Sequence, residues 1–201
     1  VLIHTDDLDA AGEAKEDLDF IFDILDKIWK IKIVDPSYIL GVNRIITRDA
    51  TGKIIASEMC MKAYVEGAAE AFRSDLPHGN VNEFYPDKLL LLKGDATEAE
   101  AKRNLDRGYQ RACGIVIWAV RHVFVEGKFG VSQFTSVMAH PSDKAYRAIM
   151  ACIAYMEQRS ARGIKFSVDG NQVPYGSFDA SNKPNPENGL CQIGYVLTMM
   201  N

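Results

Sequence analysis

The chain has 201 residues, of which 47% are hydrophobic and 25% are charged, a composition that excludes a disordered or fibrous protein. Its formal charge of −4 at pH 7 excludes binding of nucleic acid through overall positive charge, so any such contact must come from local sites. Because no apolar run approaches the roughly 20 residues that cross a bilayer and the four cysteines form no CxxC pair, we expect an intracellular, soluble chain with free, buried thiols.

The first residues predict a strand that ends on two adjacent aspartates, Asp6 and Asp7, and then turns. Closely placed carboxylates at such a turn are what two-metal nucleotidyl transfer requires. The same residues also fit a helix cap or an acidic turn, because aspartate is favoured in both places. The local pattern leaves these interpretations open.

Apolar residues then recur at three- and four-residue steps from Leu18 to Ile28, which predicts an amphipathic helix. The β-branched runs 38–48 and 53–57, separated by Asp49–Gly52, predict a hairpin. Ser57 is a candidate cap for a helix that reaches Phe72. The two tryptophans, Trp29 and Trp118, are most simply core anchors.

The segment 73–96 is rich in turn residues and is the candidate linker. Thr97 and Glu100 predict a capping box at the start of a helical tract toward Val125, and Gly108 and Gly114 weaken the pattern for one continuous helix. A shorter helix to about residue 139 and a helix after Ser142 complete this part.

The last 40 residues predict three strands of a new sheet, at 164–168, 175–181 and 191–200. Asp179 lies in the middle of the second strand among apolar neighbours, a costly place for a carboxylate that binds nothing. An Asx turn into Ser181 is the alternative interpretation.

The order of these motifs resembles that of the copia-type retrotransposon reverse transcriptases over nearly the whole chain. Asp6 and Asp7 look like the end of the family's Tyr-Val-Asp-Asp motif, and Tyr38–Val42 looks like its Tyr-Phe-Leu-Gly-Ile run. Three further segments are similar to the family: the helix Met59–Phe72, the run Tyr109–Trp118 and the stretch Val131–Pro141. Tyr175–Ala180 and Gly194–Val196 look like the start of the family's ribonuclease H domain.

This resemblance implies an α+β fold with partial polymerase palm hairpins and a helix, a helical thumb and connection, and an incomplete ribonuclease-H-like sheet. The implied segments are the end of the palm and start of the thumb (1–75), a linker and helix start (76–105), the helical thumb and connection (106–160) and the start of ribonuclease H (161–201).

The resemblance also implies the roles of individual residues. Asp6 and Asp7 would be catalytic carboxylates that hold Mg²⁺ or Mn²⁺, and Asp179 would be the first catalytic, metal-binding acid of the ribonuclease H site. His4, Leu40 and Gly41 would contact the primer or nucleotide.

By resemblance, the chain is a fragment of a Pol polyprotein, an RNA-directed DNA polymerase with ribonuclease H activity in a cytoplasmic particle or the nucleus. This nucleotidyltransferase would bind an RNA or DNA template-primer and deoxynucleotides. The third palm aspartate and the remaining ribonuclease H acids would lie outside the 201 residues, so we expect neither metal site to be complete and the isolated segment to be inactive.

Two departures from the family pattern stand out: His4-Thr5 replaces Tyr-Val, and Val123–Glu126 replaces Thr-Arg-Pro-Asp. The first departure and the acidic balance favour an alternative, a decayed element whose product is a non-catalytic binding or scaffold module. A third interpretation is an unrelated α+β metal-binding domain.

The remaining polar residues predict structural roles. The histidines His78, His122 and His140 have no metal-ligand spacing. The basic residues of 93–107 alternate with acidic ones, which is typical of a solvated mixed face rather than a nucleic-acid track.

Overall fold

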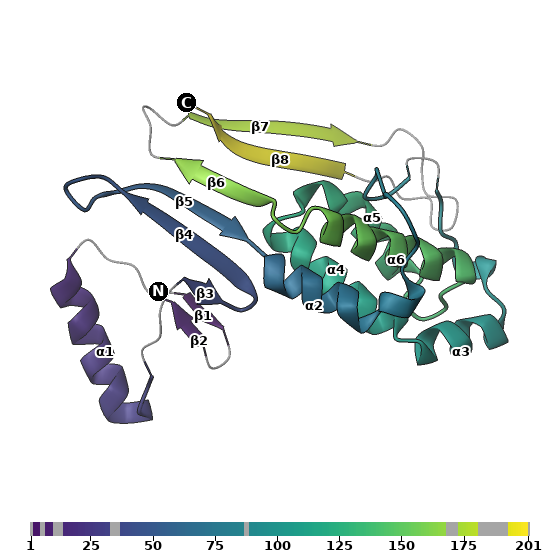
Figure 1. The fold of residues 1–201 in the computed structure, drawn as a ribbon, viewed down its shortest axis with the longest axis horizontal. Helices are drawn as coiled ribbons and strands as arrows, with labels where there is room; N and C mark the ends of the chain where they lie inside the picture. The colour runs from purple at the N-terminus through teal and green to yellow at the C-terminus, as the bar shows by residue number, and fades with distance from the viewer. Residues whose placement is uncertain are drawn as a thin grey trace.

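The computed structural model describes residues 2–4, 7–9, 14–32, 37–86, 89–167, 173–180 and 193–200, with the backbone alone for the short strands at the two ends of the chain. It contains helices and antiparallel strands, with the helices from α2 to α6 grouped between β5 and β6 (Figure 1), which confirms the predicted α+β class. Among the described helices, none combines the length and apolar character that a bilayer span requires.

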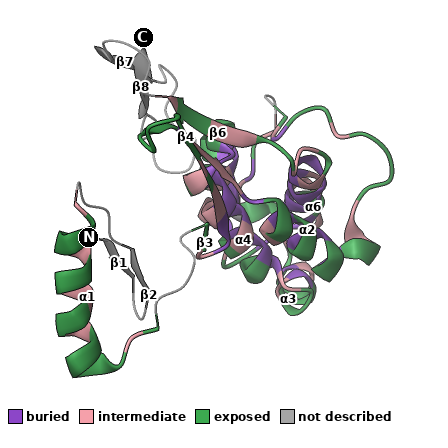
Figure 2. Ribbon diagram, turned by 60° about the vertical axis from the view of Figure 1, so that its left-hand side comes forward, coloured by how far each residue is buried: buried purple, intermediate pink, exposed green. Residues whose placement is uncertain are grey.

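The chain begins with a small antiparallel pair, β1 (Leu2–His4) and β2 (Asp7–Asp9), followed by helix α1 (Lys15–Trp29). The helix confirms the predicted amphipathic segment. None of its residues is buried, and Trp29 is 68% exposed, so the prediction that Trp29 anchors the core is wrong. Figure 2 shows α1 as a largely exposed rod, separate from the helices that hold the core. The apolar face of this amphipathic helix is therefore not buried in this chain.

A four-stranded antiparallel sheet follows, in the order β3 (Tyr38–Ile39), β4 (Val42–Arg48), β5 (Ile54–Cys60) and β6 (Gly163–Ser167). Its centre is the predicted hairpin. The carboxylate of Asp49 closes that hairpin by accepting hydrogen bonds from the backbone N–H groups of Thr51 at 2.8 Å and Lys53 at 3.0 Å. The local turn residues therefore produce the expected turn.

Two predictions about this sheet are wrong. Ser57 does not cap a helix, because it lies within β5 opposite Ile46, and the next helix begins after Met61 without a side-chain cap. Strand β6 does not belong to a new sheet either, since it pairs with β5. Glycine suits this pairing, because a Cβ at Gly163 would lie 2.9 Å from the backbone carbonyl oxygen of Met59.

The helical part contains α2 (Lys62–Ala71), α3 (Glu98–Asp106), α4 (Tyr109–His122), α5 (Lys128–Ser136) and α6 (Asp143–Gln158). Short 3₁₀ turns lie at Arg73–Asp75, Lys93–Asp95 and Val125–Gly127. The tract after Thr97 is two helices rather than one, because Gly108 adopts φ +91° between α3 and α4. Gly114, in contrast, lies inside α4.

Two helix starts follow their local sequence signals. The Thr97 hydroxyl accepts a hydrogen bond from the Glu100 N–H at 3.3 Å, and the Ser142 hydroxyl accepts one from the Ala145 N–H at 3.2 Å. The Glu100 carboxylate accepts from the Asp143 N–H, at the start of α6. The Thr97 half of the predicted capping box therefore forms within α3. The Glu100 side chain instead contacts the start of α6.

The hydrophobic core lies where α2 and α4 pack against α6, with α5 beside α4 (Figures 1 and 2). Its largest fully buried side chains include Tyr109, Tyr146, Phe124, Phe134 and Ile149. Burial of each such side chain stabilises the fold by about 1.5–3 kcal/mol. The buried thiols of Cys113 and Cys152 and the half-buried thiol of Cys60 are free, as expected, whereas Cys191 lies outside the described residues.

Ion pairs join α3 to its neighbours. Arg107 contacts Asp75 at 2.8 Å and lies over the ring of Tyr146 at 3.8 Å, and Arg103 contacts Asp143 at 2.7 Å. The prediction of a merely solvated mixed face is therefore incomplete, because these two arginines connect separate elements.

At the end of the chain, β7 (Val173–Ala180) pairs with β8 (Ile193–Met200) as a two-stranded antiparallel sheet. The prediction of strands in these two regions is confirmed. The predicted three-stranded sheet is wrong, since the first of its strands is β6, whose partner is β5.

Candidate functional site

Of the predicted metal-binding aspartates, the structure describes Asp7, which belongs to the first pair of strands. Asp7 is the first residue of β2 and pairs with His4, the last residue of β1. Asp6 lies outside the described residues. The register therefore puts Asp7 at the end of the strand pair where the chain reverses, and Asp9 at the opposite end, beside Leu2.

The second predicted element, Leu40-Gly41, is the two-residue connection between β3 and β4. Tyr38 pairs with Asn43 and Ile39 pairs with Val42, which leaves Leu40 and Gly41 as the turn. Both have positive φ, +52° and +84°, as a type I′ hairpin turn requires. Leucine in the left-handed region costs about 1–2 kcal/mol, so this turn is strained.

Trp118 of α4 holds the strained turn in place. Its indole Nε1 donates a hydrogen bond to the Leu40 carbonyl oxygen at 3.0 Å. The indole also packs beside the imidazole of His122, with 4.2 Å between the ring centroids, and the His122 Nδ1 lies 2.8 Å from the Trp118 carbonyl oxygen. The tryptophan is thus fixed at both its ring and its backbone.

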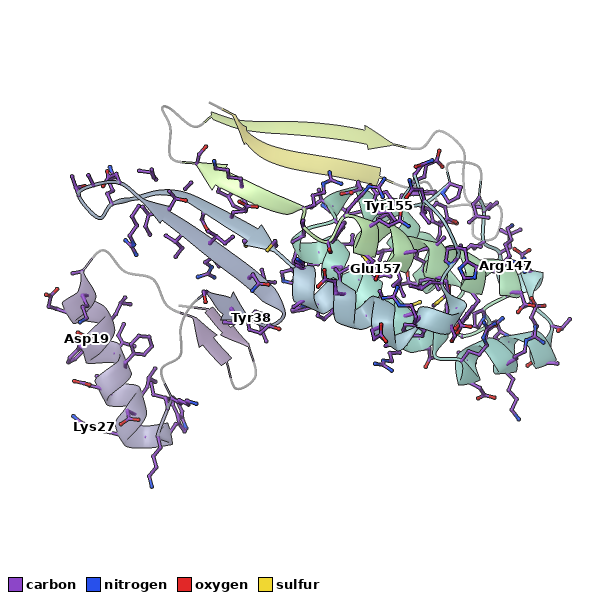
Figure 3. All side chains as sticks on the ribbon, in the orientation of Figure 1. Asp19, Lys27, Tyr38, Arg147, Tyr155 and Glu157 are labelled. Carbon is purple, nitrogen blue, oxygen red and sulfur yellow. The ribbon has the colours of Figure 1, made fainter. Side chains whose placement is uncertain are left out.

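Tyr64 of α2 holds the other side of the turn. A Cβ at Gly41 would lie 2.9 Å from Cδ2 of Tyr64, so the ring packs directly on the glycine backbone. Tyr64 is half-buried against the core, and this burial raises the pKa of its hydroxyl. Tyr38, labelled beside β3 in Figure 3, is in contrast half-exposed at the entry to the turn.

The turn is therefore a rigid surface feature. Its backbone is held by the aromatic side chains of Tyr64 and Trp118, which come from two helices and lie 24 and 78 positions after Leu40 in the sequence. Sequence reasoning assigned Leu40 and Gly41 to substrate contact but missed Tyr64 and Trp118 as their supports. Both aromatic residues lie within the motif-like segments 59–72 and 109–118, which is the signal that could have identified them.

Asp179 lies on β7 opposite Gly194 of β8. This pair of strands and the β1–β2 pair are separate two-stranded sheets. The register thus gives the position of Asp179 along its strand.

Among the residues that the structure describes, no group of three or more histidine, cysteine, aspartate or glutamate residues is placed to hold a metal ion. His140 lies 3.9 Å from Glu98 at the surface, and His122 contacts the α4 backbone. These contacts agree with the structural roles expected for both histidines.

No protein-family model, curated protein or solved structure matches this chain.

Proposed function

We propose that this chain is a segment of an RNA-directed DNA polymerase of the copia-type reverse transcriptase class, in which the Leu40-Gly41 turn contacts the primer end. The observation that carries the proposal is the strained turn held by Trp118 and Tyr64. Backbone strain that persists because distant residues enforce it is concentrated at binding and catalytic sites. The ordered resemblance of the motifs supplies the class of reaction.

The rigidity of the turn suits this role. A polymerase must hold the primer hydroxyl within a fraction of an ångström of its productive position, which favours sites built on fixed elements. Leu40 and Gly41 join two strands and rest on two helices of the main core. A loop without these contacts would move with each cycle of binding.

Asp6 and Asp7 are the residues that would hold the metal ions in this proposal. Asp7 lies at the end of a strand pair. Together with Asp6, its neighbour in the sequence, it would supply the oxygen ligands that Mg²⁺ and Mn²⁺ prefer. When bound, such ions lower the pKa of the attacking hydroxyl and neutralise phosphate charge. Asp179 would play the corresponding part in a ribonuclease H site.

Primer extension by the complete polypeptide that contains residues 1–201 tests the proposal. With an RNA template, a DNA primer, deoxynucleotides and Mg²⁺, we expect synthesis that Asp7→Asn lowers by about 100-fold or more, a loss of roughly 2.7 kcal/mol of transition-state stabilisation. Asp9→Asn is the matched control, because Asp9 shares the strand but lies at its far end. Equal activities of both variants would reject the assignment of Asp7.

The isolated 201-residue chain provides a second outcome. We expect it to be inactive, and Asp6-dependent synthesis by it alone would contradict this expectation. If the complete polypeptide binds template-primer but never extends it, the decayed, non-catalytic binding module is the better account.

A further inference from the structure

The outer part of the four-stranded sheet has two faces of different chemistry. Ile46 of β4, Ser57 of β5 and Phe166 of β6 are paired across the sheet and share one face. The adjacent row, Ile45, Glu58 and Lys165, lies on the opposite face, because successive residues of a strand point to opposite sides. Figure 1 shows β4 and β5 as a long hairpin that extends away from the helices, with β6 beside β5.

Arginine side chains of β4 lie on the first of these faces. Arg48 lies two residues beyond Ile46, so alternation along β4 puts its side chain on the same side, although the pairing with β5 shifts register between Thr47 and Arg48. Arg44 lies two residues before Ile46. Arg48 is exposed and donates one hydrogen bond to the Gly52 carbonyl oxygen at 2.8 Å. A guanidinium carries five N–H donors, so this bond positions the group and leaves donors for a ligand.

The same face carries no carboxylate within β4, β5 and β6. The acidic residue of these strands is Glu58, which lies in the opposite row. We call the four residues Ile46, Arg48, Ser57 and Phe166 the Phe166 face. Its charge therefore complements an anion.

An exposed aromatic ring adds a second kind of contact. Phe166 is 52% exposed, and its cross-strand neighbours Ser57 and Ile46 leave it at the surface. Burial in a core does not explain a large aromatic residue at this exposure. An aromatic ring and a cationic side chain on one face of a sheet are suited to stack a nucleic-acid base and to contact a phosphate of the same strand.

We propose that the Phe166 face binds single-stranded nucleic acid, with Phe166 stacked on a base and Arg48 bound to a backbone phosphate. This inference rests on the proposed function, because it extends the path of the strand held at Leu40-Gly41. Strand β4 begins directly after that turn and runs outward to Arg48. Phe166 lies two strands from β4, about 10 Å away, a separation that a strand of a few nucleotides spans.

The test is fluorescence anisotropy with the 201-residue chain and two labelled 15-mers, oligo(dT) and an abasic strand with the same phosphates. We expect oligo(dT) to bind more tightly than the abasic strand. Phe166→Ala should weaken oligo(dT) binding about fivefold or more and leave abasic binding unchanged. Phe166→Leu, which keeps an apolar side chain, should have the same effect and guards against a folding defect.

Arg48→Ala should weaken the binding of both oligonucleotides. It should also lower the slope of log affinity against log salt concentration by about 0.7. The opposite face supplies matched controls. Lys165→Ala removes an exposed cation and Ile45→Ala removes a 55% exposed apolar side chain, and each should change affinity by less than about twofold.

Two results would overturn the inference: no binding of oligo(dT) by the wild-type chain, or equal losses for the variants of the two faces. The outcomes remain distinct from those of the proposed function. Oligo(dT) binding through the Phe166 face without polymerase activity in the complete polypeptide would reject the polymerase alone. If the complete polypeptide is an active polymerase but the Arg48 and Phe166 variants bind oligo(dT) as tightly as wild type, only the role of the Phe166 face is rejected.

Discussion

The indole nitrogen of Trp118 donates a hydrogen bond to the carbonyl oxygen of Leu40 at 3.0 Å, across 78 positions of sequence. The acceptor belongs to a leucine with φ +52°, a conformation that leucine rarely adopts. Helix α4 therefore fixes the backbone of a turn on the sheet, and this link connects the helical core to the proposed primer contact.

Replacement of the indole should weaken that link. Trp118→Phe keeps an aromatic ring but removes the N–H donor, which leaves the Leu40 carbonyl without this partner. We expect the free energy of unfolding in urea to fall by about 1–2 kcal/mol. Trp29→Phe is the control, since Trp29 is exposed on α1, and its effect should stay within about 0.5 kcal/mol. Similar losses for both would contradict the role given to Trp118.

The contact of Tyr64 with the turn can be separated from backbone strain by two glycines of nearly equal φ. Gly41 has φ +84° and faces Tyr64, whereas Gly52 has φ +87° with no atom within 4 Å of an added Cβ. Gly52→Ala should cost about 1 kcal/mol from backbone strain, and Gly41→Ala should cost at least about 1 kcal/mol more. Equal unfolding free energies for the two variants would show that Tyr64 gives way.

Asp75 should make stability depend on acidic pH. Hydrogen bonds from Tyr146 and then Arg107 lower the pKa of its carboxyl group in the folded chain. A lowered folded-state pKa stabilises the fold above the unfolded value of about 3.9, and this stabilisation is lost as pH falls through the folded value. The difference in unfolding free energy between wild type and Asp75→Asn should therefore be largest near neutral pH and shrink below about pH 4.

Exposed Asp106 provides the comparison for that substitution. At neutral pH, the difference in unfolding free energy between wild type and Asp106→Asn should stay within about 0.5 kcal/mol, as is usual for a surface substitution. An Asp75→Asn difference that stays constant from neutral to acidic pH would contradict the ion pair with Arg107 and the hydrogen bond from Tyr146.

Thiol reactivity should follow burial. Burial raises the pKa of the Cys113 thiol to about 12 and raises that of Cys152 well above its ordinary value, whereas Cys60 is half-buried. Because the thiolate is the reactive form, iodoacetamide at pH 8 should label the Cys60 peptide before the Cys113 and Cys152 peptides in the native chain. Mass spectrometry should detect labelled Cys113 and Cys152 only after unfolding in urea. Labelling of all three at one rate would contradict the packing of the core.

Local signals predicted the local features of this fold. Thr97 and Ser142 cap their helices, and Asp49 closes the β4–β5 turn, because each of these interactions lies within four residues. The turn of the candidate site was not predicted in this way, because the pattern indicated one β-branched run over residues 38–48, which Leu40 and Gly41 divide into β3 and β4. Only the family resemblance assigned these two residues a role.

Features that depend on distant partners could not be predicted in the same way. Periodicity identified 164–168 as a strand but carries no information on its partner, which is β5. Trp29 and Trp118 have the same intrinsic preference for burial, yet one is exposed and the other supports a turn. The Glu100 carboxylate likewise contacts the start of α6 rather than its own helix.

The central claim, that the Leu40-Gly41 turn lies at the primer end, is tested most directly by photocrosslinking. A primer with 4-thiothymidine at its 3′ end is annealed to template, bound to the complete polypeptide and irradiated, and the labelled peptides are identified by mass spectrometry. We predict a crosslink within residues 38–43. Crosslinks confined to other segments, such as the distant turn at 49–52, with none at residues 38–43, would contradict the claim.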